Sequence, residues 1–425
     1  YFFRGIAPMS GGGGQFLNLL IYSFYIIQGT EAEKEGKNIM TWKEFEKNVR
    51  EIASYRWGCT ATQRTIAGVR CDCILEVDTD SWVAVEITQE HNLVKIREDV
   101  AKLISLRNHL IADNIYCKCY IVMQETPTDA MRDTGKAQKV TVMSVKEFRD
   151  DFFNYSNYVF IRKQKPFGSL INIETGEPEN NIYVNVSYIQ KDSGNQFTVA
   201  DIIDNLKRGK HIVLKGDFGL GKSRCVKQVF DKLTANPAEN FHTIAINLRD
   251  HWGAKRTSEI LSRHFCDLGI VEHNFMKIYE APRNIYLLDG FDEIGTQAWS
   301  SDARKMQHIR ELSMAGLKDL IQHVQGGILI TGREYYFNSD SEMMSSLGLS
   351  PEQTVILECQ QEFTDSELLD FIRNNIPEGI GSETLGELPL WFPKRPLVIQ
   401  LLLKCGDIFS IKKYLIIFTV FGIIF

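Results

Sequence analysis

Apolar residues between positions 40 and 160 recur at spacings that switch between helix and strand. The stretch "TWKEFEKNVREI" has apolar residues three and four positions apart after a candidate cap, Thr41, which predicts an amphipathic helix. The runs "GVRCDCILEV" and "SWVAVEIT" predict two strands joined by a turn, and later runs predict two more strands and a final capped helix. Residues 40–160 are therefore predicted to form one α/β domain. Its longest helix has an apolar face made of Leu93, Ile96, Val100, Leu103, Leu106 and Leu110.

The pattern changes after residue 160. Residues 161–196 mix Pro, Gly, Asn and charged residues with short strand-like pieces, which favours a linker. Within residues 197–350, four apolar runs, "HIVLKG", "FHTIAINL", "NIYLLDG" and "GGILITG", are each followed by a helical stretch. This alternation predicts a parallel sheet with helices on both faces. Residues 351–425 are expected to begin a helical domain that is cut short.

The two ends of the sequence favour a fragment of a longer protein. The first residue is not Met, and residues 1–39 are left unassigned because they could be foreign to the native protein. The apolar runs at 16–27 and 414–425 are shorter than the roughly 20 residues that a membrane-spanning helix needs. We therefore expect no membrane segment.

Composition narrows the class of protein only in part. A chain of 425 residues with 44% hydrophobic residues can bury two or three cores. Nine scattered cysteines favour a reducing cytoplasm, and the two Cys-x-Cys pairs are predicted to be packed strand residues. The formal net charge of −6 gives no general attraction for nucleic acid. Any contact with DNA would need a local basic patch, for which the candidates are Arg162, Lys163 and Lys165, or Lys207, Arg208 and Lys210.

The stretch "GDFGLGKS" after the run "HIVLK" has the spacing of a phosphate-binding loop. Its glycines allow backbone N–H groups to face a phosphate, and the helix that follows presents its positive end. In this motif the lysine neutralises phosphate charge and the serine ligates Mg²⁺. The alternative is an ordinary glycine turn between a strand and a helix. The predicted nucleotide ligands here are Gly216, Gly219, Gly221, Lys222 and Ser223.

A second strand supplies carboxylates. The run "NIYLLDGFDEI" places Asp289 where a strand ends, the edge at which ligands bind in α/β sheets. Asp289 is predicted to hold Mg²⁺ through water, and Asp292 or Glu293 could orient the water that attacks the phosphate. The alternative is that these two acids only cap a solvated helix.

These motifs resemble those of the NACHT subfamily of STAND P-loop ATPases, over about residues 197–404. The resemblance rests on "LLDGFDEI", on "GGILITGRE", and on "FTDSELLDFIRNNI" with "LPLWFPKRPLVIQLLL". It implies that Arg333 reads the γ-phosphate and that Pro396 packs near the base of ADP. It further implies ATP rather than GTP, an ADP-bound resting state, an ATP-bound homo-oligomer, and an unknown trigger protein sensed by a C-terminal region that this sequence lacks.

Two acids in the first domain suggest separate chemistry. Asp72 and Glu86 lie on neighbouring predicted strands, where a hairpin can bring them together to bind Mg²⁺ and activate water. The order of elements resembles the PD-(D/E)XK restriction-endonuclease-like fold, in which Glu46 would match an extra acid. The lysine of that motif is replaced by Thr88, so a lysine from the next helix would have to act, for which the candidates are Lys95 and Lys102, with Gln89 adjacent.

The combined prediction is an ATP-dependent switch in the cytoplasm. The combination resembles bacterial anti-phage STAND proteins, and that resemblance implies that recognition of the trigger causes oligomerisation, which activates a DNA nuclease in anti-phage defence. One alternative is a NACHT ATPase scaffold whose first domain is an inert binding module. An ATP-dependent restriction motor is a weaker alternative, because the helicase motifs that it needs are absent after Arg333.

Overall fold

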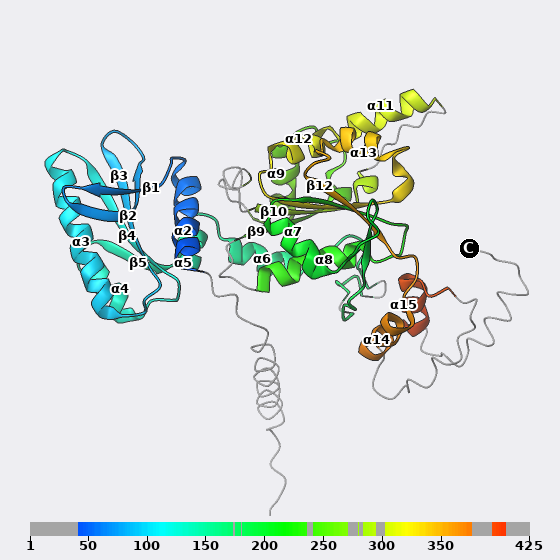
Figure 1. Cartoon of the computed structure of the whole chain (residues 1–425), viewed down its shortest axis with the longest axis horizontal. Coiled ribbons are helices and arrows are strands. Elements are labelled where there is room, and N and C mark those ends of the chain that lie inside the picture. The colour runs from blue at the N-terminus through cyan, green and yellow to red at the C-terminus, as the bar shows by residue number, and fades with distance from the viewer. Residues whose placement is uncertain are drawn as a thin grey trace, which may run out of the picture. The chain divides into compact units, whose positions relative to one another are not determined.

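The computed structural model describes residues 41–172, 175–179, 181–235, 241–270, 279, 284–294, 302–375 and 393–404. Residues 1–39, the last 21 residues and part of the predicted helical domain lie outside these ranges. Two sheets organise the chain, one of five strands and one of seven (Figure 1). Among the described residues, no helix is both long enough and apolar enough to cross a bilayer.

The first sheet is mixed. Its strands lie side by side in sequence order, and the pairs β1–β2 and β2–β3 are antiparallel, whereas β3–β4 and β4–β5 are parallel. The strands are β1 (Thr62–Ile66), β2 (Val69–Glu76), β3 (Ser81–Thr88), β4 (Tyr116–Met123) and β5 (Val140–Ser144), and the helices are α2 (Trp42–Trp57), α3 (Leu93–Ala112), α4 (Asp129–Lys136) and α5 (Val145–Asp150).

Helix α3 packs on this sheet through the apolar face that its sequence predicts. Five of the six predicted apolar positions are buried, and Leu93 is partly buried against the same core. Asp99 is also buried on this helix, although a charged residue is almost never buried without a partner. A polar cluster at α3 is therefore a feature of the structure that apolar spacing does not predict.

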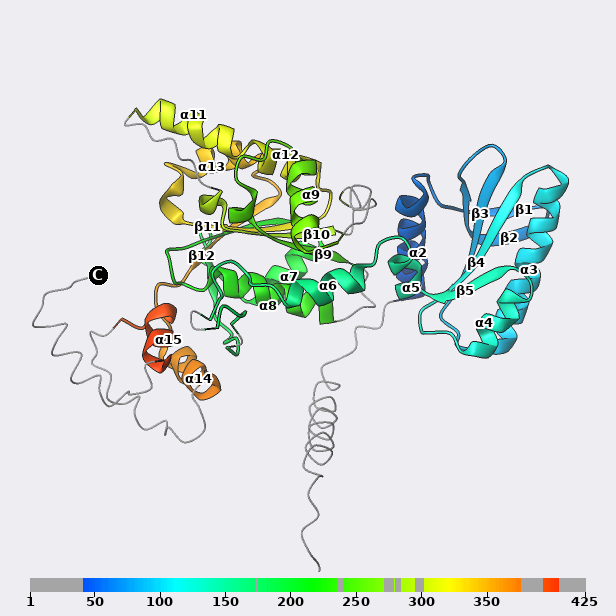
Figure 2. The same ribbon diagram turned by 180° about the vertical axis from the view of Figure 1, so that it is seen from behind.

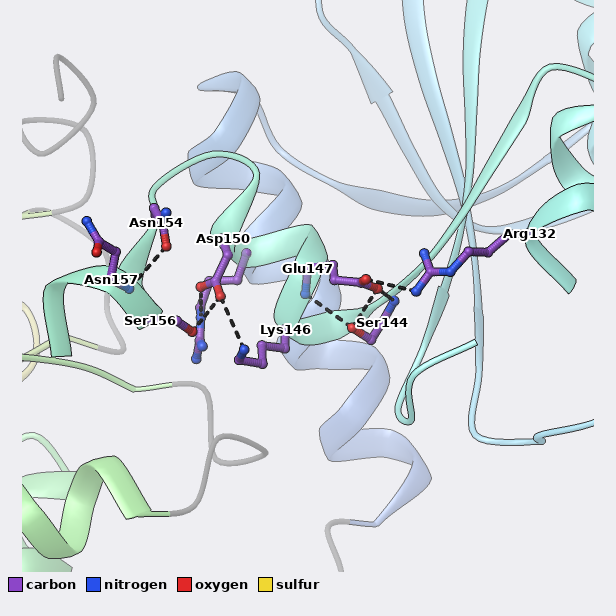
Figure 3. A network of polar contacts seen from close by, with 9 residues as sticks. Arg132, Ser144, Lys146, Glu147, Asp150, Asn154, Ser156 and Asn157 are labelled. Atoms are coloured by element: carbon purple, nitrogen blue, oxygen red, sulfur yellow. Dashed lines mark hydrogen bonds and ion pairs between the residues drawn. The ribbon is translucent and has the colours of Figure 1, made fainter. Parts of the chain in front are cut away.

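A hydrogen-bonded turn joins α5, which follows the last strand of the first sheet, to the next helix, α6 (Tyr155–Lys163) (Figure 3). Ser144 and Glu147 form a capping box at the start of α5, and Glu147 also accepts a hydrogen bond from Arg132 at 2.8 Å. Ser156 Oγ in the first turn of α6 donates to Asp150 Oδ2 at the end of α5, at 2.6 Å. These bonds leave α5 and α6 joined by a short, ordered connection.

The second sheet is mostly parallel. Its strand order is β7-β6-β12-β8-β11-β10-β9, and the pairs β7–β6 and β6–β12 are antiparallel, whereas the other pairs are parallel. Strand β11 therefore lies between β8 and β10. The strands are β6 (Tyr188–Gln190), β7 (Gln196–Phe197), β8 (His211–Lys215), β9 (His242–Asn247), β10 (Asn284–Asp289), β11 (Gly327–Gly332) and β12 (Thr354–Cys359).

Helices cover both faces of this sheet, as the alternation of strands and helices predicts. Figures 1 and 2 show α7 (Val199–Lys207) and α8 (Lys222–Ala235) on one face, and α9 (Thr257–Asp267), α12 (Ala315–His323) and α13 (Asp340–Leu347) on the other. The remaining helices are α11 (Ala303–Ser313), α14 (Asp365–Asn375) and α15 (Pro396–Lys404), with short 3-10 turns at Leu248–His251, Phe291–Glu293 and Glu334–Tyr336.

Three expectations from the sequence differ from the structure in detail. Residues 161–196, expected to be a linker, contribute β6 and the first residue of β7 to the second sheet. Strand β12 falls inside residues 351–425, expected to be helical, yet pairs with β8. Arg162, a candidate for a basic surface patch, is only 2% exposed and therefore cannot serve there.

Candidate functional site

The glycine-rich loop lies between β8 and α8, as its motif requires. Gly219 and Gly221 have φ angles of +81° and +90°, a backbone region that glycine tolerates and other residues rarely adopt. Lys222 Nζ donates to the carbonyl oxygens of Gly216 and Asp217, at 2.7 and 2.9 Å. The amine therefore folds back onto the carbonyls of its own loop, the segment that would hold a phosphate group.

Helix α15 contacts the same loop. The backbone N–H of Leu397 donates to the carbonyl of Gly219 at 3.2 Å, and a Cβ atom built on Gly219 would lie 2.8 Å from Leu397 Cβ. Pro396, predicted to pack near the nucleotide, is the first residue of α15 and precedes Leu397. The structure thus brings this proline next to a residue that packs on the loop.

Asp289 ends β10 and is 4% exposed. Thr331 Oγ1, on the neighbouring strand β11, donates to Asp289 Oδ1 at 2.6 Å. Asp289 Oδ2 is buried and has no hydrogen-bond partner among the described residues. Because a buried carboxylate oxygen without a partner is costly, this oxygen is suited to a ligand. Thr331 is a positioning residue that the sequence reasoning missed, and its signal was a hydroxyl within an otherwise apolar strand.

The oxygen atoms of Asp289 and Ser223 face a common point. A Cβ atom built on Gly168 would lie 2.3 Å from Asp289 Oδ2 and 2.4 Å from Ser223 Oγ. Both are hard oxygen ligands of the kind that Mg²⁺ prefers. The chemistry of these two oxygen ligands therefore suits a magnesium ion held with a nucleotide, and Ser223 and Asp289 would hold it once the space beside Gly168 is open.

The two acids after Asp289 are each paired with an arginine. Asp292 Oδ2 lies 2.9 Å from Arg333 Nε, and Asp292 Oδ1 also accepts the backbone N–H of Arg333 at 3.1 Å. Glu293 accepts from Arg249, whose contact nitrogens lie 2.7 and 2.8 Å away. Burial raises the pKa of Glu293, and the charge of Arg249 opposes that rise.

Arg333 lies at the glycine-rich loop because β11 is the neighbour of β8. Its guanidinium carbon lies 6.0 Å from the centroid of the Phe218 ring, within that loop. The structure thus brings together the loop, Asp289 and Arg333, all of which the sequence predicts for one site.

The first sheet holds the second predicted site. Asp72 on β2 accepts the backbone N–H of Ile87 through Oδ2 at 3.1 Å. Glu86 on β3 is 1% exposed; burial, and then the charge of Asp72, raise its pKa to about 7. The hairpin therefore places the two carboxylates close enough for their charges to interact. Within the described residues, no group of three or more His, Cys, Asp and Glu is arranged to hold a metal.

The lysine that reaches Glu86 is Lys102. Its Nζ lies 2.5 Å from Glu86 Oε2, whereas Lys95 Nζ lies 2.8 Å from Asp99 Oδ1 on the same helix. Of the two candidate lysines, Lys102 is therefore the one that contacts Glu86, whereas Lys95 does not. Thr88, in the place of that lysine, is buried, and its hydroxyl accepts the backbone N–H of Glu90 at 3.1 Å.

The raised pKa of Glu86 predicts a pH dependence of stability. Since the folded pKa of about 7 lies above the ordinary value of 4.5, the folded state binds more protons between these values, and stability falls as pH rises through this window. The loss of stability is complete about one pH unit above the folded pKa and is expected to be on the order of 3 kcal/mol. Denaturation of the first domain, followed by tryptophan fluorescence at pH 5 and pH 8, should show a smaller decrease for Glu86→Gln than for the parent. Glu98→Gln, an exposed change on α3, should keep the parental slope, and an equal slope in Glu86→Gln would refute the assignment.

No family model matches the chain, and no curated protein matches it. Several solved structures are distantly similar to about half of it. The structure of Drosophila ORC bound to DNA is 12% identical in sequence and has a TM-score of 0.30. The match covers 51% of this chain and 54% of the ORC chain. Cdc6p from Pyrobaculum aerophilum is 14% identical, with a TM-score of 0.30, and the match covers 51% of this chain and 61% of the Cdc6p chain. A Walker-type ATPase of Pyrococcus abyssi is 13% identical, with a TM-score of 0.30, and the match covers 55% of this chain and 77% of the ATPase chain.

The chain spans less than two thirds of the first two of these proteins. The chain's own geometry indicates its class of protein: a strand, a glycine-rich loop and a helix follow one another within a mostly parallel sheet. The glycine-rich loop between β8 and α8 has the sequence and the setting of a P-loop. A second α/β domain, built on a mixed sheet, precedes the domain of this loop in the sequence.

Proposed function

We propose that this protein is an ATP-dependent switch of the NACHT type that controls a DNA nuclease. The observation that carries the proposal is the convergence of Lys222, Ser223, Asp289 and Arg333 at one edge of a parallel sheet. Such a convergence supplies charge, a metal site and a phosphate sensor together. In this proposal the protein acts in the cytoplasm, oligomerises when a trigger protein is recognised, and serves in anti-phage defence.

Each residue of the nucleotide site has a role in this proposal. Lys222 turns from its loop carbonyls toward the phosphates, while Ser223 and Asp289 hold Mg²⁺ and Thr331 fixes the carboxylate of Asp289. Bound Mg²⁺ would neutralise charge on the phosphate oxygens. Asp292 and Glu293 are the candidates to orient water, which requires that their arginine partners release them.

The effector role is assigned to the first domain. Asp72 and Glu86 would bind Mg²⁺, and Lys102 would take the place of the lysine missing at Thr88. Lys102 is suited to this role because its charge already stabilises the ionised form of Glu86. A cation on these carboxylates would activate water for phosphodiester cleavage.

A scaffold with an inert first domain is the second candidate. It is favoured by the closed Lys102–Glu86 ion pair and by the raised pKa of Glu86, since a protonated or paired carboxylate binds a cation less well. In that case the ATPase-like domain would still control assembly, and the first domain would only recruit a partner.

Cleavage of linear DNA by the full chain tests the proposal. The protein is incubated with Mg²⁺ and with or without ATP, at a concentration high enough to permit self-assembly, alongside Glu86→Gln and Lys222→Met. We expect the parent to cut DNA in response to ATP. Glu86→Gln should abolish cutting at every ATP concentration, and cutting by Lys222→Met should not respond to ATP. Two exposed changes, Glu98→Gln and Lys232→Met, are matched controls and should behave as the parent.

The outcomes separate the two candidates. Nucleotide-dependent assembly without any cutting would support the scaffold and overturn the nuclease assignment. Cutting that persists in Glu86→Gln would mean that the activity does not come from this site.

A further inference from the structure

Residues 165–170, which we call the strap, run from the end of α6 across the nucleotide site. Gly168, in its middle, is buried and has a φ angle of +52°. Its backbone N–H donates to Oδ1 of Asn247, the last residue of β9, at 3.0 Å. Asn247 is the register partner of Asp289 on the adjacent strand. The strap is therefore held at the strand ends where Asp289 lies.

A buried arginine, Arg162, holds the strap through hydrogen bonds to its backbone carbonyls. Arg162, in the last turn of α6, donates through Nη1 to the carbonyls of Lys165 and Pro166, both at 3.1 Å, and through Nη2 to Asn247 Oδ1 at 3.1 Å. Its guanidinium carbon lies 3.7 Å from the centroid of the Phe167 ring. Asn247 Nδ2 closes the arrangement by donating to the Pro166 carbonyl at 3.2 Å. Two side chains thus hold a strap that belongs to no strand or helix.

Gly168 stands where the cation would need room. A Cβ atom built on Gly168 would lie 2.3 Å from Asp289 Oδ2 and 2.4 Å from Ser223 Oγ. The Gly168 Cα atom is roughly one 1.5 Å bond from that position, so the backbone of Gly168 lies close to both oxygens. Magnesium requires octahedral ligands at about 2.0–2.1 Å and keeps several waters. An ion with these waters does not fit between the two side chains while Gly168 remains there.

We propose that the strap is an autoinhibitory closure of the magnesium position, which must withdraw before Mg-nucleotide is held by Ser223 and Asp289. This inference rests on the proposed nucleotide function. Withdrawal breaks the bonds of Gly168 and Pro166 to Asn247 and of Arg162 to the strap. Because α6 follows α5 through the hydrogen-bonded turn of Figure 3, the strap also provides a covalent route from the nucleotide site toward the first domain.

Chymotrypsin reports the state of the strap in the unmodified chain. Phe167 is 2% exposed while the strap is closed, so cleavage between Phe167 and Gly168 should be slow. Addition of Mg²⁺ and a non-hydrolysable ATP analogue should accelerate this cleavage at least fivefold, as measured by mass spectrometry of the fragments, and chelation of Mg²⁺ should reverse the effect. Equal cleavage in all conditions, with Mg-nucleotide bound, overturns the inference.

Two variants test the same contact by opposite means. Gly168→Ala adds a methyl group that collides with Asp289 and Ser223 and disfavours the positive φ angle, whereas Asn247→Ala removes the anchor and adds nothing. Both should expose the Phe167–Gly168 bond without nucleotide and raise the Mg²⁺-dependent part of ATP-analogue affinity severalfold. Gly176→Ala is the matched control, because Gly176 has a φ of +71° but nothing within 4 Å of its built Cβ.

The results distinguish this inference from the function on which it rests. If the parent chain binds no Mg-nucleotide, both are overturned. If the parent binds it but both variants lose Mg²⁺-dependent affinity and resist chymotrypsin as the parent does, the strap is a fixed wall of the site rather than a closure. In that case the nucleotide function stands and the inference falls.

Discussion

Replacing Lys222 by methionine is expected to weaken Mg-ATP binding on the order of a hundredfold. The amine lies over the loop, 2.7 and 2.9 Å from two of its carbonyls, and it is the only cation in the motif "GDFGLGKS". Loss of one partner from a partly buried pair of opposite charges costs about 2–5 kcal/mol, and about 2.7 kcal/mol corresponds to a hundredfold change in affinity. Equilibrium titration with a fluorescent ATP analogue in the presence of Mg²⁺ measures this directly.

The control for that titration is Lys232→Met. Lys232 is exposed on the same helix, α8, so it matches the change of charge and side-chain volume at a distance from the loop. Its affinity should equal that of the parent. An affinity of Lys222→Met within twofold of the parent, in a variant with a parental circular dichroism spectrum, would remove the basis of the switch.

Replacing Lys102 by methionine is expected to reduce DNA cleavage by roughly a hundredfold or more, the range seen when a single electrostatic group is removed from an active site. Lys102 lies 2.5 Å from Glu86 and lowers the pKa of that buried carboxylate. Without it, the pKa of Glu86 should rise further above 7, so that any residual cutting is displaced to higher pH. Initial cleavage rates between pH 6 and pH 9 measure both effects.

Lys95→Met is the matched variant for this experiment, because Lys95 lies on the same helix and pairs with Asp99 instead. It should retain cutting within a few fold of the parent and keep the parental pH profile. If Lys95→Met loses cutting while Lys102→Met retains it, Lys95 is the lysine that acts with Glu86 and the choice of Lys102 from its contact is wrong.

Local patterns predicted much of the fold and placed the residues of the candidate nucleotide site on the elements where the structure has them. The loop and Asp289 were found because each lies beside a strand whose apolar run marks its end. The buried face of α3 was found because helical spacing is a strong signal. Strand β1, "TQRTI", was missed because three of its five residues are exposed and polar, so no alternation indicates it.

The parts that could not be predicted depend on segments far apart in the sequence. The choice between Lys102 and Lys95 depends on how α3 packs on the first sheet, because both lysines lie on the same side of the helix. The approach of Gly168 to Asp289 joins positions separated by more than a hundred residues, and nothing in the local sequence marks it. Strand β12 was assigned to the helical region because its neighbour, β8, precedes it by more than a hundred residues.

The contact between Gly219 and Leu397 changes how mutations in the loop should be interpreted. A side chain at position 219 would collide with Leu397 as well as strain the backbone, since φ is +81°. Glycine would therefore be required at this position for α15 to pack on the loop, even if no phosphate were bound there. A variant at Gly219 is for that reason a poor diagnostic of nucleotide loss, and Lys222 is the cleaner one.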